Sequence, residues 1–95
     1  MFELIIKAIE VQLFIFNAYS LKDKRSVVRS LIEKIKNRFN VSICETDNLS
    51  LWNKATIAIA CVSNAAAHCD QIMDKVINFI DGDDRVEVTN ISTIM

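Results

Sequence analysis

The residues best suited to chemistry in this sequence are the basic side chains between positions 21 and 39. That stretch holds seven of the eleven Lys and Arg residues against two acidic ones, although the whole chain has a net charge of −1 at pH 7. Helical periodicity would bring four of the seven into one arc of about 60°, beside an apolar stripe. These four are Lys22, Arg25, Arg29 and Lys36. Cations gathered on one helix face are typical of a surface that binds phosphate groups.

Three cations, Lys22, Lys24 and Arg25, fall in the first turns of the predicted helix. A cation there opposes the helix dipole, at a cost of roughly 0.3–1 kcal/mol. An anion held by the exposed N–H groups and the same side chains would offset that cost. We therefore predict a phosphate- or RNA-binding site made of Lys22, Lys24, Arg25, Arg29 and Lys36. The alternative is an ordinary solvated helix face. Asp23 supports this alternative if its carboxylate already satisfies the N-terminal amides that an anion would need.

Other chemistry-bearing residues do not form a recognised site. His68 and Cys69 are neighbours in a predicted helix, where adjacent side chains point about 100° apart, so we expect no catalytic pair. One His and three dispersed Cys give no zinc spacing, and the Asp residues around Gly82 lack the pattern of a calcium loop. Residues 17–20 have neither the Gly nor the Arg of an acylphosphatase anion loop. We expect no enzymatic activity, no metal and no cofactor.

The cysteines and the N-terminal segment indicate where the protein works. Cys44, Cys61 and Cys69 form no C-x-x-C pair and are odd in number, as in proteins that keep reduced thiols in the cytosol. Lys7 interrupts the apolar N-terminal segment, and we expect neither a signal peptide nor a membrane span. A composition of 52% hydrophobic and 24% charged residues suits a folded chain. We expect one cytoplasmic domain over residues 1–95.

The elements that must position these residues follow from the spacing of the apolar side chains. Alternation predicts a long half-buried strand over residues 4–16, and spacings of three and four predict a helix from residue 21 to about 39. Further strands are predicted over residues 41–46, 55–62 and 85 to about 91. A second helix lies before the last strand, with a buried stripe of Cys69, Ile72, Met73, Val76 and Ile80.

Capping residues support both predicted helices. Ser20, with Asp23 three residues later, has the spacing of a capping box for the first helix. Ser63 and Asn64 are candidate N-caps for the second helix. Gly82 is expected to end that helix in the left-handed conformation.

The predicted order β-α-β-β-α-β is that of a ferredoxin-like α+β sandwich, a four-stranded antiparallel sheet with two helices on one face. The first and third strands should lie in the centre. The uncovered face is apolar enough to favour a second copy of the chain or a partner, and we predict that contact at Phe14, Phe16 and Ala58. Trp52, in the loop before the third strand, either stacks on a partner or covers the end of the core, as the size of its indole favours.

The run SLKDKRSVVRSL at residues 20–31 resembles the opening of the first helix in the YlxP-like family of short bacterial proteins of unknown function. Further similarities are RFNVSI at 38–43, LW at 51–52 and VSN at 62–64, and the resemblance covers about nine-tenths of the chain. Tyr19 stands where the family usually has a His, so no role for that ring is carried over. The resemblance implies a ferredoxin-like fold, a cytosolic location and genes beside those of translation and ribosome-assembly factors.

Two functions of different classes remain open. The first is a non-enzymatic ribosome- or RNA-associated factor that binds phosphate backbone through the first helix. It would not read bases on its sheet, because an RNA-recognition sheet needs aromatics on both central strands and the third strand offers Thr56, Ala58 and Ala60. The alternative is an oligomerising or ligand-sensing ferredoxin-like module with no nucleic-acid role.

Overall fold

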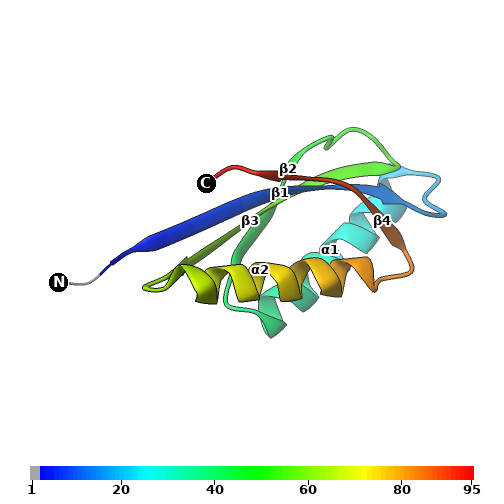
Figure 1. Cartoon of the computed structure of the whole chain (residues 1–95). Helices are drawn as coiled ribbons and strands as arrows, with labels where there is room; N and C mark the ends of the chain where they lie inside the picture. Colours follow the sequence, from blue (N-terminus) through cyan, green and yellow to red (C-terminus); the bar gives the residue numbers. More distant parts are fainter. Residues whose placement is uncertain (1–2) are drawn as a thin grey trace.

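The computed structural model describes residues 3–95 and confirms the predicted ferredoxin-like α+β fold (Figure 1). The elements are β1 (Ile5–Ile15), α1 (Leu21–Arg38), β2 (Ser42–Asp47), β3 (Lys54–Ser63), α2 (Ala66–Asp81) and β4 (Val86–Thr93). The strands and α1 begin and end within about two residues of their predicted positions, because apolar periodicity marks them clearly.

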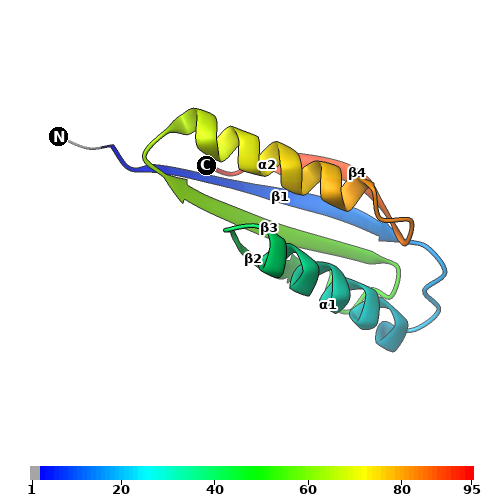
Figure 2. The same ribbon diagram turned by 90° about the horizontal axis from the view of Figure 1, so that it is seen from below.

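The four strands form one antiparallel sheet in the order β2-β3-β1-β4. β1 and β3 therefore lie in the centre, as predicted. Both helices lie on the same face of the sheet, where α1 packs against β2 and α2 packs against β1, β3 and β4 (Figure 2). The opposite face has no covering element among the described residues, and we call it the open face.

The core lies between the sheet and the two helices. Alternate side chains of β1, from Ile9 to Ile15, are at most 8% exposed, while the intervening ones point to the open face. The buried helix positions that meet them are Val28, Leu31 and Ile35 of α1 and Cys69, Met73, Val76 and Ile80 of α2. Both stripes match the spacings expected of amphipathic helices.

The caps of α1 are those predicted, and those of α2 are not. Ser20 Oγ accepts a hydrogen bond from the Asp23 amide at 3.1 Å. In α2 the N-cap is Ala65, which has no side-chain cap, because Ser63 Oγ accepts instead from the Ala65 amide, one residue before the helix. Gly82 has φ −81°, so the prediction of a left-handed end is wrong. Its amide donates to the Asn78 carbonyl, which closes the helix without a reversal of handedness.

The three thiols differ in accessibility. Cys44 is exposed on β2, whereas Cys61 and Cys69 are buried, and Cys69 Sγ donates to the Cys61 carbonyl at 3.8 Å. Burial, with a smaller contribution from Cys69, raises the pKa of Cys61 from 9.0 to about 11. Since this pKa is raised on folding, the thiol's contribution to stability is full below pH 9 and is lost as pH rises towards 11.

A thiol-reactive reagent at pH 8 is therefore expected to label the exposed Cys44 of the native protein quickly and the buried Cys61 and Cys69 slowly. Thiolates react and buried neutral thiols do not. The Cys44→Ser variant should lose the fast labelling phase, and all three cysteines of the wild type should react once urea has unfolded the protein. Fast labelling of native Cys44→Ser would show that the core around Cys61 and Cys69 is open.

Candidate functional site

The four cations predicted to share one side of α1 do so in the structure. Lys22, Arg25, Arg29 and Lys36, which we call the basic stripe, are all exposed. Within residues 3–95, none of them lies in an ion pair. The first three line a shallow groove of about 570 Å³, together with Ser26, Ser30 and Glu33.

The helix fixes the direction of the stripe. Arg25 and Arg29 also border a hollow shared with Glu45 of β2. The stripe therefore lies on the side of α1 next to β2, the edge strand of the sheet. The inner face of α1 is held by core residues, which prevents the helix from rotating. The packed helix therefore keeps the four cations on the same exposed side of α1.

Lys24 does not belong to this surface, and its predicted role in the phosphate site is wrong. Its side chain is 0% exposed. Lys24 Nζ lies 2.7 Å from Glu45 Oε2 and donates to the carbonyl of Asn48, also at 2.7 Å. The reason is its position, because Lys24 lies four residues before Val28 and seven before Leu31, on the buried face of α1. That spacing was the signal that could have identified it as a buried residue.

Lys24 connects three elements. Glu45 lies on β2, and its Oε2 accepts no hydrogen bond of regular geometry in the described chain, so the close contact with Lys24 acts as a charge pair. Asn48 begins the β2–β3 loop in the left-handed region, at φ 61°. Its Nδ2 donates to Thr56 Oγ1 at 2.9 Å. The ammonium group thus joins the first turns of α1 to β2 and to the loop above the open face.

The N-terminus of α1 is already capped. The Asp23 carboxylate accepts from the Tyr19 amide at 3.1 Å, while the Asp23 amide donates to Ser20. This carboxylate in the first turn also lowers the cost of the nearby cations. An anion at the stripe would therefore depend on the side chains of Lys22, Arg25 and Arg29 more than on free helix amides.

Asp83 belongs to an ion pair that stabilises the turn after α2. Arg85 donates to both carboxylate oxygens of Asp83, at 2.9 and 2.7 Å, and to Ser30 Oγ of α1 at 3.2 Å. These bonds hold the pKa of Asp83 below its ordinary value, so its contribution to stability is present at neutral pH and is lost as pH falls. Across residues 3–95 no group of three His, Cys, Asp or Glu side chains could hold a metal ion.

The residues predicted to contact a partner all lie on the open face. The rings of Phe14 and Phe16 meet edge to face at 5.4 Å, and Phe16 is 41% exposed. Ala58 pairs with Glu10, two rows along the sheet from Phe14. The partner contact itself stays a prediction. Trp52 is 47% exposed, so our interpretation that it covers the core is wrong.

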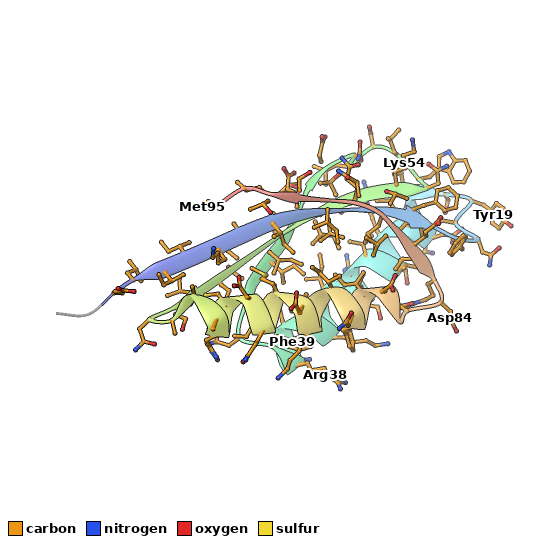
Figure 3. The ribbon with its side chains drawn as sticks, viewed as in Figure 1. Tyr19, Arg38, Phe39, Lys54, Asp84 and Met95 are labelled. Atoms are coloured by element: carbon orange, nitrogen blue, oxygen red, sulfur yellow. The ribbon has the colours of Figure 1, made fainter. Side chains whose placement is uncertain are left out.

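Figure 3 shows Tyr19 and Lys54 toward one end of the molecule, and Arg38 and Phe39 on the side of the helical layer that faces away from the sheet. No helix within residues 3–95 is both long and apolar enough to cross a membrane.

Comparison with known proteins gives consistent results. A family model described as protein of unknown function (DUF503) matches residues 6–93. The Bacillus subtilis (strain 168) protein described as "Uncharacterized protein YlxP" is 34% identical over 80 residues, which cover 84% of this chain and 87% of that protein. The chain therefore belongs to the DUF503 family, which confirms the resemblance seen in its sequence.

Proposed function

We propose that this protein is a non-enzymatic RNA-associated factor, acting with the ribosome or its assembly, that binds phosphate backbone through the basic stripe of α1. The observation that carries the proposal is the exposed row of Lys22, Arg25, Arg29 and Lys36 without ion-pair partners in the described chain. The whole chain has a net charge of −1, so the row is a local concentration of positive charge on an otherwise acidic protein. A polyanion gains from it, because each neutralised phosphate releases bound counterions.

The dimensions of the row suit several consecutive phosphates. Lys22 and Lys36 are about 21 Å apart along the helix at 1.5 Å per residue. A strand in a duplex carries one phosphate per 3.4 Å of axis, so about six phosphates could lie along the stripe. The gene neighbourhood implied by the family resemblance agrees with this function, by association rather than by chemistry.

The salt dependence of RNA binding tests the proposal directly. Four phosphate contacts are expected to give a slope of about −3 when the logarithm of the association constant is plotted against that of salt concentration. Fluorescence anisotropy of a labelled RNA, titrated with the protein at several salt concentrations, would measure the slope. Gradient sedimentation of tagged protein from lysate at low and high salt would show whether ribosomal particles are the target. No binding at low salt, or a slope near zero, would contradict the proposal.

A second candidate function is assembly of two copies of the chain through the open face. Ile6 and Val62 pair across β1 and β3, Ile94 lies beside them next to Ala8, and the three are 41%, 59% and 51% exposed. Apolar side chains gathered at one end of a sheet favour a contact that removes them from water.

Ala58→Glu places a charge in the middle of that face and is expected to convert a dimer into a monomer, because a charge buried without a partner is costly. Sedimentation velocity at high micromolar concentration would measure the change. Ala67→Glu, on the exposed side of α2, makes the same substitution away from the open face and should leave the dimer unchanged. A monomeric wild type would exclude this assembly.

A further inference from the structure

A second surface with unused chemistry lies where the C-terminal end of α1 meets α2. A groove of about 590 Å³ opens there, and we call it the helix-end groove. Its lining includes Arg38, Phe39, Asn40, Lys75, Asn78 and Phe79. It shares no lining residue with the basic stripe, of which Lys22, Arg25 and Arg29 line other hollows.

The floor of the groove is aromatic and held in one orientation. The rings of Phe39 and Phe79 meet edge to face with centroids 5.9 Å apart. The Arg38 guanidinium lies 5.2 Å from the centre of the Phe79 ring, in the range of a cation–π contact. Aromatic rings and guanidinium planes are the two side-chain groups on which unpaired RNA bases stack.

The walls of the groove carry polar groups of two kinds. Asn40 and Asn78 are exposed carboxamides, each with two donors and an acceptor that can match the edge of a base. Arg38 and Lys75 are exposed cations, and no acidic residue lines the groove. The groove therefore offers a stacking surface, edge-matching amides and positive charge, which correspond to the face, edge and phosphate of a nucleotide.

The groove lies at the same end of α1 as Lys36, the last residue of the basic stripe, but on the other side of the helix. Lys36 of the stripe and Arg38 of the groove are both in the last turn of α1, about 200° apart around the helix. A strand whose phosphates follow the stripe would thus pass around the C-terminal end of α1 to enter the groove.

We infer that the helix-end groove binds one unpaired nucleobase of single-stranded RNA, stacked on the Arg38 guanidinium that lies over the Phe79 ring. The inference rests on the proposed function, which it extends from backbone binding to the recognition of an unpaired nucleotide. An acidic peptide with an apolar anchor would use the cations and the rings as well. The two exposed carboxamides favour a base, because its edge needs both donors and acceptors.

The first test examines the groove without the stripe. AMP, titrated into isotopically labelled protein, is expected to shift the amide signals of residues 38–40 and 75–79 much more strongly than ribose 5-phosphate, which has the phosphate but no base. Phe79→Leu and Asn78→Ala should each reduce the shifts, and thermal melting would confirm that both variants fold. An acidic peptide such as Asp-Glu-Phe-Glu-Asp serves as the competing probe. If the peptide shifts these signals and AMP does not, or if neither does, the inference is overturned.

The second test separates the inference from the proposed function. An eight-nucleotide oligoadenylate should bind about 5- to 150-fold more tightly than an abasic strand of the same length, the range expected for one stacked base. Phe79→Leu should remove most of this preference and Asn78→Ala should reduce it, and neither change should weaken binding of the abasic strand. Equal, salt-dependent binding of both strands overturns the inference and leaves the proposed function intact. If neither strand binds at low salt, the proposed function fails. The AMP titration alone then decides whether the groove binds a nucleobase.

Discussion

Lys24→Met is expected to lower the free energy of unfolding by about 3 kcal/mol, since it leaves the Glu45 carboxylate and the Asn48 carbonyl without their cationic partner. Breaking a buried ion pair from one side costs about 3–5 kcal/mol, and Glu45 retains 16% exposure, so the lower end of that range applies. In a domain of this size the melting temperature should fall by about 12 °C or more. Urea unfolding followed by circular dichroism would measure both quantities.

Two further variants identify the cause of this destabilisation. Lys34→Met makes the same change at an exposed position of α1 and should cost less than about 0.5 kcal/mol. The double variant Lys24→Met and Glu45→Met should recover most of the stability, because an apolar pair removes the uncompensated charge. If the double variant is less stable than Lys24→Met alone, packing of the lysine stem rather than charge pairing explains the loss.

Arg25→Glu combined with Arg29→Glu is expected to weaken RNA binding about 100-fold at low salt and to reduce the salt slope by about two. The change removes two cations from the centre of the basic stripe and adds two carboxylates that repel phosphate. Both positions are exposed, so the fold should be unaffected. Anisotropy with the same RNA over a series of salt concentrations would give both numbers.

A matched control makes this result specific to the stripe. Lys34→Glu combined with Lys54→Glu changes the net charge by the same amount, at exposed positions outside the stripe. It should lower the affinity only slightly, through the overall field of the protein. Equal losses in the two double variants would mean that binding follows net charge, and the basic stripe would then not be the binding surface.

The sequence predicts most of this fold because its periodic signals are local. The alternation of Ile9, Val11 and Leu13 gave β1, and the spacing of Val28 and Leu31 gave α1, since side-chain direction follows directly from backbone geometry. The basic stripe could be predicted for the same reason. Its four members share a side of one helix whatever that helix packs against.

Features that depend on distant partners could not be predicted. The spacing of Lys24 with Val28 indicated its inward position, but the pairing itself could not be predicted. Its partners Glu45 and Asn48 follow 21 and 24 positions later, and no local pattern reveals that pairing. Trp52 was expected to be buried because of its size, yet its loop leaves it half exposed. The helix-end groove was missed because Arg38 and Phe79 belong to different helices.

The order of the strands has a consequence for how the chain folds during its synthesis. β1 is made first, but it pairs only with β3 and β4, and even its nearest paired residue, Lys54 opposite Phe14, follows 40 positions later. The centre of the sheet thus has high contact order, which slows folding. Until β3 has left the ribosome, β1 remains an unpaired apolar segment with a tendency to aggregate. Early formation of α1, whose contacts within the helix are local, would shorten the search once β3 is available.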